Sequence, residues 1–189
     1  MDDREDVHRG PVRKRKRIHE PSLSPEDFSD RLFLSDVSKY GDKYIEHLLE
    51  QYKLYVESAD RISDRRQKTN EFFLGLNTAI VALLGFIATK LTGAPLKAVF
   101  VCTSLAGGVL CYCWYRIVRS YKGLNTGKFA VIHAIEKRLP LSLYATEWEV
   151  LKRGEDRSVY WPFTHIELAV PWVFVVLYVV VLVAGLFVS

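Results

Sequence analysis

The chain has 189 residues, of which 49% are hydrophobic and 25% are charged, and its formal net charge is +4 at pH 7. A chain of this length would ordinarily form one soluble domain, but its apolar residues are gathered in three uncharged runs. These runs, 72–89, 98–115 and 168–189, are each close to the roughly 20 residues that a helix needs to cross a bilayer. The pattern argues against a soluble protein and predicts an all-α membrane protein with three transmembrane helices.

Residues 1–23 are polar and contain a run of five basic residues. In a soluble protein, such a run would indicate nuclear import or nucleic-acid binding. Beside a membrane, attraction to anionic lipid head groups is the simpler hypothesis, and a solvated disordered tail is the alternative. We therefore expect no nucleic-acid partner. The basic run consists of Arg13, Lys14, Arg15, Lys16 and Arg17.

The segment 24–71 predicts a short cytoplasmic helix followed by a long stem. Ser24 is a suitable helix cap, Pro25 suits the first helical position, and two acidic residues follow. Residues 44–89 contain no proline, and their first glycine is Gly75. They predict a single helix that begins in water and ends in lipid.

The stem has a heptad seam, because apolar residues alternate along it at spacings of three and four. This pattern lets one helix lie along another over several turns. Arg66 lies on the seam next to the first apolar run, so we expect it to reach the membrane surface or to pair with an acid on a neighbouring helix. The seam residues are Ile45, Leu48, Tyr52, Tyr55, Ala59, Ile62 and Arg66.

The first span, 72–89, has a stripe of mostly small residues on one face. Small residues let helices approach closely in lipid, where van der Waals contact drives association. We therefore expect this stripe to pack against other helices of the assembly. It consists of Glu71, Gly75, Thr78, Ala82, Gly85 and Thr89, and the second span, 98–115, adds Ser104, Gly107 and Gly108.

Asn77 and Thr78 place polar groups about one turn inside the membrane. Unpaired polar groups are costly there, so we interpret both residues as partners in interhelical hydrogen bonds, with a water-filled path as the alternative. The third span, 168–189, is nearly all Val, Leu and Phe from Val173 onward. We expect the first two spans to face protein and the third to face lipid.

A loop, 90–97, joins the first two spans, and the longer segment 116–167 predicts further helices. Asn125 is expected to cap a helix that Pro140 ends, and Thr146 to cap a shorter one that Gly154 ends. The apolar faces of these helices need a partner. The seam of the stem is the expected one, which gives a cytoplasmic helical domain.

Lysine and arginine are distributed unevenly: 15 precede residue 72, nine lie in 116–167, and two lie between the first two spans. The positive-inside rule then places the N-terminus and 116–167 in the cytoplasm. The loop 90–97 and the C-terminus are expected outside.

The sequence offers no enzymatic, metal or cofactor site. His133 and Glu136 are three residues apart, and His165 and Glu167 are two apart, but a zinc site needs three or four ligands. No phosphate-binding loop or nucleophile motif occurs, so we expect no enzymatic activity and no cofactor. The three cysteines, all in the second span, are expected to be buried reduced thiols.

Several short motifs follow one another between residues 44 and 170. They lie at 51–56, 59–66, 70–78, 124–125, 128–129, 131–132, 135–136, 139–140, 147–148 and 163–167. In their order and spacing these motifs resemble the RipA-like family of small bacterial cytoplasmic-membrane proteins. The resemblance implies a homo-octamer in the bacterial inner membrane, with no established enzymatic activity, and it supplies no binding residues.

Two functional hypotheses follow. The first is a cyclic homo-oligomeric scaffold that displays a ring of cytoplasmic helices to lipid or to an unidentified cytoplasmic partner. The second is a pore or a signal-gated effector, in which the stem senses a signal and the first span lines a path. The long stem and few spans are similar in architecture to effector domains of bacterial nucleotide-signalling defence systems.

Overall fold

The computed structural model describes residues 24–156, 158–159 and 163–187, and all regular elements within these ranges are helices. In chain order they are α1 Pro25–Leu32, α2 Val37–Tyr40, α3 Tyr44–Ala88, α4 Gly93–Glu136, α5 Leu143–Val150, the 3₁₀ turn η1 Lys152–Gly154 and α6 Phe163–Leu186. Three of them, α3, α4 and α6, are long and apolar enough to cross a membrane. The predicted all-α class with three candidate spans is therefore confirmed.

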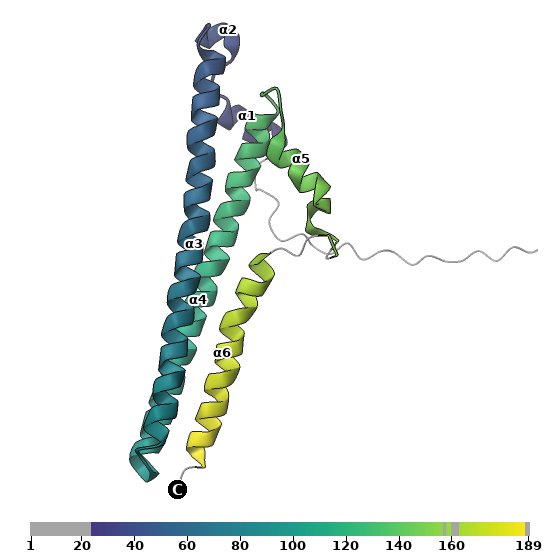
Figure 1. Ribbon diagram of the computed structural model, residues 1–189. Helices are drawn as coiled ribbons and strands as arrows, with labels where there is room; N and C mark the ends of the chain where they lie inside the picture. The colour runs from purple at the N-terminus through teal and green to yellow at the C-terminus, as the bar shows by residue number, and fades with distance from the viewer. Residues whose placement is uncertain (1–23, 157, 160–162, 188–189) are drawn as a thin grey trace, which may run out of the picture.

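The stem and the first span form one helix, as predicted. Helix α3 runs without a break over 45 residues and ends one residue before the predicted position. Its sequence has no proline, and a glycine inside a helix costs only about 1 kcal/mol, so nothing local interrupts it. Figure 1 shows α3 and α4 as neighbouring long rods, with the shorter α6 beside α4.

Helix α4 is longer than the sequence predicted. It runs unbroken over 44 residues, so the expected new helix at Asn125 does not exist, and Asn125 lies inside α4. Downstream of this point Lys128 donates a hydrogen bond to Ser58 Oγ at 2.9 Å, and its ammonium group lies 4.3 Å from the centre of the Tyr55 ring. These contacts with α3 support a continuous helix where the local sequence favours a boundary.

Helix α5 also begins earlier than predicted, at Leu143 instead of after Thr146. The cap comes from outside the segment, because the Glu136 carboxylate accepts hydrogen bonds from the backbone N–H groups of Tyr144 and Ala145. The helix also ends earlier than predicted, at Val150, and the 3₁₀ turn η1 separates it from the expected stop at Gly154. There the chain passes through a left-handed turn, with φ of 49° at Lys152, 54° at Arg153 and 69° at Gly154.

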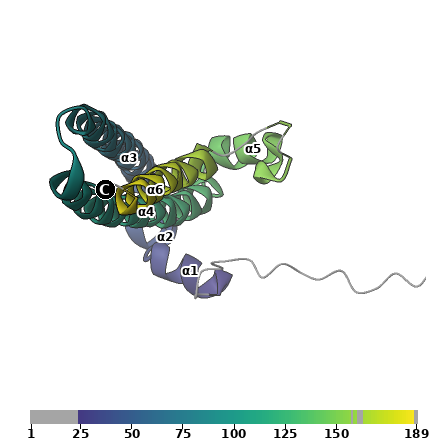
Figure 2. The same cartoon turned by 90° about the horizontal axis from the view of Figure 1, so that it is seen from below.

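Helix α6 packs along α4 and continues through Pro171. In the view from below, α6 lies against α4, and α3 is joined to α4 by a tight loop (Figure 2). The core that unites the three helices is aromatic: Phe73 stacks on Trp114 at 5.8 Å between ring centres, and Trp114 lies 6.2 Å from Phe174. The α3–α4 loop and the C-terminal end of α6 lie at the same end of the molecule (Figure 1).

The expectation that the third span faces lipid is only partly correct. Many of its side chains are exposed in the single chain, including Val173, Val176 and Val180. However, Pro171 and Tyr178 are buried against the other helices. One face of α6 is therefore a protein contact, which the uniform apolar sequence did not reveal.

Candidate functional site

A polar contact inside the membrane joins all three candidate spans at Asn77. This side chain is completely buried, and its Oδ1 accepts a hydrogen bond from the Tyr178 hydroxyl at 3.0 Å. The Cys111 thiol also donates to Oδ1, at 3.4 Å, and Nδ2 of Asn77 donates to the Phe73 carbonyl at 2.7 Å. Asn77 thus forms the predicted interhelical hydrogen bonds within its own chain. The same prediction for Thr78 is not met in the single chain, where Thr78 is exposed and forms no hydrogen bond to another helix among the described residues.

The Tyr178 ring reaches this position because Gly107 has no side chain. A Cβ atom at Gly107 would lie 2.3 Å from Cζ of Tyr178. A second close approach occurs near the C-terminal end of α6, where a Cβ at Gly185 would lie 2.8 Å from Cβ of Phe100. Gly107, which the sequence assigned to helix packing, therefore serves the contact of α4 with α6 in the same chain.

Nearer the water-facing end, Arg66 pairs with an acid on a neighbouring helix, which was one of its two predicted roles. Its Nε lies 3.5 Å from Oε2 of Glu167 on α6, and both side chains are mostly shielded from solvent. Trp114 Nε1 donates to Asn70 Oδ1 at 2.8 Å, in the same part of the bundle. An ion pair from Arg66 to α6 and a hydrogen bond from α4 to Asn70 therefore hold α3 to the other two helices where the apolar runs begin.

Beyond the spans, Glu136 holds the end of α4 to α3 and α5. Its side chain is completely buried and accepts hydrogen bonds from α3 and α5. Tyr52 Oη of α3 donates to Oε1 at 3.1 Å, and Tyr144 N of α5 donates to the same oxygen at 2.8 Å. Ala145 N donates to Oε2 at 3.0 Å. A carboxylate at the start of a helix satisfies backbone N–H groups that have no partner within the helix.

Tyr52→Phe tests this contact. Burial, together with the Glu136 carboxylate, raises the pKa of Tyr52 from 10.0 to about 12. Because the unfolded chain loses this proton first, the stability linked to Tyr52 is present below about pH 10 and is lost as the pH rises to about 12. We expect Tyr52→Phe to lower the free energy of unfolding by about 1 kcal/mol at neutral pH and to weaken its alkaline decline.

The measurement is urea unfolding of the protein in mild detergent at several pH values between neutral and alkaline. Burial also raises the pKa of Tyr55, so some alkaline decline should persist in the variant. An unchanged alkaline slope in Tyr52→Phe would contradict the assigned contact.

The seam residues of the stem mostly face α4. Ala59 is buried, Ile45 is exposed, and the remaining members are half-buried. Tyr55 lies under Lys128 of α4, so part of the seam is already used within the chain. The half-buried members are Leu48, Tyr52, Tyr55, Ile62 and Arg66.

The small-residue stripe of the first span, in contrast, faces away from the rest of the chain. A Cβ atom added at Gly75 or Gly85 would meet no atom within 4 Å, and the same is true of Gly108 on α4. Ser104, also on α4, is buried. The exposed stripe residues are Glu71, Gly75, Thr78, Ala82, Gly85 and Thr89.

Two residues of these contacts were not identified from sequence. Tyr178 lies in the apolar run that we expected to face lipid, although a tyrosine there needs a hydrogen-bond partner and could have been matched with Asn77. Glu136 was weighed as a metal ligand with His133, and its capping role was not predictable because it lies inside the helix expected to end at Pro140, ten residues before the predicted cap Thr146. The basic run Arg13–Arg17 lies outside the described residues.

No group of three or more His, Cys, Asp or Glu side chains suited to a metal occurs among the described residues. Cys111 is buried, as expected, but Cys102 and Cys113 are exposed on the single chain. A cavity of about 220 Å³ lies between α1 and the last turns of α4, lined by Phe28, Phe33 and His133 among others. Its open shape and mainly apolar walls assign no chemistry to it.

A family model described as "Octameric membrane protein family (8xMP)" matches residues 49–187 of the chain. The match covers most of α3 and all of α4 and α6, and it confirms the family relationship that the sequence motifs indicated. No curated protein and no solved structure matches the chain.

Proposed function

We propose that this chain, which belongs to the octameric membrane protein family, assembles as a ring of eight copies and acts as a membrane scaffold without enzymatic activity. The ring would sit in a bacterial inner membrane and display the water-soluble ends of α3 and α4, with α1 and α5, on the cytoplasmic side. The partners that this ring would bind are lipid and an unidentified cytoplasmic protein.

The observation that supports assembly is the unused small-residue stripe of α3. Where helices of the same chain meet, a neighbouring side chain occupies the space beside the glycine: Tyr178 packs against Gly107, and Phe100 packs against Gly185. Gly75 and Gly85 have open space above them in the single chain. Since small residues in membrane helices permit close helix contact, a second copy is the partner that would occupy this face.

The orientation of the scaffold rests on the uneven distribution of Lys and Arg. We predict that a reporter fused after Ser189 will be active only if the reporter works outside the cytoplasm. A matched fusion after Glu155, which precedes α6, should show the opposite behaviour. Cytoplasmic activity of the Ser189 fusion would refute the model of three spans with the N-terminus inside.

Particle-image reconstruction of the purified protein in lipid nanodiscs tests the scaffold proposal. It should show eight copies in a closed ring, with the α3 stripe in contact with a neighbouring chain. A monomer, or a ring in which the stripe contacts only lipid, would overturn the proposal.

A pore or signal-gated effector is the second candidate, because the exposed stripe includes Glu71, Thr78 and Thr89. In a ring with these side chains at its centre, the stripe would be wetted rather than packed. Asn77 would not contribute, since it is paired inside its own chain. Conductance across planar bilayers that changes in Thr78→Val would favour the pore, and a silent bilayer favours the scaffold.

A further inference from the structure

A basic surface on α4 takes no part in the contacts described above. Arg116, Arg119 and Lys122 are spaced three residues apart, so they lie on one side of the helix, and all three are exposed. Among the described residues, none of the three has a carboxylate within ion-pairing distance. The sequence from Ala98 to Ile135 contains no acidic residue. This surface, the basic α4 surface, therefore has charge of one sign.

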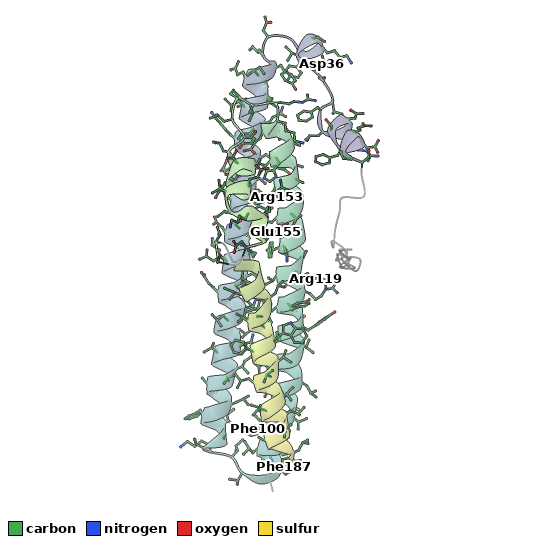
Figure 3. The ribbon with its side chains drawn as sticks, turned by 90° about the vertical axis from the view of Figure 1, so that its right-hand side faces the viewer. Asp36, Phe100, Arg119, Arg153, Glu155 and Phe187 are labelled. Carbon is green, nitrogen blue, oxygen red and sulfur yellow. The ribbon has the colours of Figure 1, made fainter. Side chains whose placement is uncertain are left out.

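The basic α4 surface lies where the second candidate span meets water. The uncharged run of that span ends at Tyr115, directly before Arg116. Figure 3 shows Arg119 pointing away from the bundle, near the level of the first turns of α6. Because α6 enters its own apolar run within these turns, a membrane crossed by the apolar runs of α4 and α6 would place the guanidinium group of Arg119 at the depth of the lipid head groups.

Two aromatic side chains lie next to this surface on the membrane side. The rings of Tyr115 and Trp172 are 5.6 Å apart in an edge-on arrangement, and 54% of Trp172 is exposed. Tyrosine and tryptophan prefer the boundary between head groups and acyl chains. The acid of α6 at this depth, Glu167, is already paired with Arg66. A negative charge for the basic α4 surface therefore has to come from outside these helices.

We propose that the basic α4 surface binds the phosphate head group of an anionic phospholipid, with the Tyr115–Trp172 pair at the acyl boundary. Guanidinium and ammonium groups bind phosphate oxygens through charge-assisted hydrogen bonds, and arginine can do so through two donors at once. The depth of the surface and the aromatic pair favour lipid over an acidic segment of a second copy. The site goes beyond the scaffold role, since it requires only that the spans cross a membrane.

Native mass spectrometry of the full-length assembly in mild detergent tests the site. The protein is titrated with phosphatidylglycerol or phosphatidylcholine of identical acyl chains, and the ratio of the two affinities is measured. We expect the unaltered protein to prefer phosphatidylglycerol. The double variant Arg119→Gln/Lys122→Gln should lower that preference about thirtyfold, because two basic residues near the surface together contribute about 2 kcal/mol.

Two variants control for general effects of charge and folding. Lys152→Gln/Arg153→Gln removes the same charge from two exposed residues that pair with Asp156 and Glu149. Arg119→Lys keeps the charge of the basic α4 surface. Both should retain the preference for phosphatidylglycerol, and the basic run before residue 24 is present in every variant.

Three results would overturn the proposal. The first is an equal loss of preference in the Lys152→Gln/Arg153→Gln control, which would show a nonspecific effect of net charge. The second is an unchanged preference in the Arg119→Gln/Lys122→Gln variant. The third is a fall in oligomer mass in that variant without a change in lipid preference, which would assign the basic α4 surface to contact with a second copy.

Discussion

Replacing Gly107 with alanine is expected to destabilise the three-helix bundle by about 1–3 kcal/mol, the cost typical of an overpacked contact. A Cβ atom at this position would lie 2.3 Å from the Tyr178 ring, so the ring or all of α6 has to move. Either movement disturbs the 3.0 Å hydrogen bond from Tyr178 to Asn77. In lipid, the separated polar groups have no water to replace the lost partner.

Gly108 provides the matched control, because it is the next residue of the same helix and a Cβ there would meet no atom within 4 Å. Gly108→Ala should leave the stability of the isolated chain unchanged or raise it by up to about 1 kcal/mol, since alanine is the better helix former. Unfolding in sodium dodecyl sulfate, followed by circular dichroism, measures both variants. Equal effects of the two substitutions would contradict the packing of Tyr178 over Gly107.

The sequence was sufficient to predict α3 and the three candidate spans, because their signals are local. The absence of proline from 44 to 89 and the uncharged runs identify α3 and the candidate spans without reference to any partner. The boundary expected at Asn125 was wrong for the opposite reason. Helix α4 continues there with support from Tyr55 and Ser58 on α3, and a contact so distant in sequence leaves no local signal.

The contacts between helices were only partly predictable. Asn77 was expected to form an interhelical hydrogen bond because an unpaired amide in lipid is costly, but its partner depends on how α6 packs. Tyr178 lies 101 residues later, in a run of valine and leucine that has almost no helical pattern. Glycines identify where helices can approach closely, and only the structure separates Gly107, which Tyr178 covers, from Gly85, which has open space.

Because Gly85 has open space in the single chain and Gly107 does not, a larger side chain at Gly85 is expected to impair assembly rather than folding. Gly85→Leu and Ala82→Leu add bulk to the exposed stripe, and at Gly85 the single chain presents no atom within 4 Å of the new Cβ. Each chain should therefore still fold. Where the stripe contacts a neighbouring chain, the added side chain should weaken each interface by about 1–3 kcal/mol.

Ala184→Leu is the matched control for bulk, because Ala184 is exposed on α6, and Val180→Ala and Val183→Ala alter exposed positions of the same helix. If α6 presents these side chains to lipid, all three variants should keep the mass of the unaltered assembly. Mass measurement in mild detergent compares the two groups. A monomeric unaltered protein, or equal masses for the stripe and α6 variants, would refute assembly through the α3 stripe.

In a closed ring every chain contributes the same head-to-tail contact, so one substitution alters every interface at once. The loss per interface is then repeated around the ring, and a cost of about 1–3 kcal/mol at each contact is enough to shift the population from rings to single chains. Gly107→Ala should behave differently, because its clash lies inside the chain. Loss of chain stability in Gly107→Ala and loss of assembly in Gly85→Leu would therefore separate the contacts that fold α6 against α4 from those that join one copy to the next.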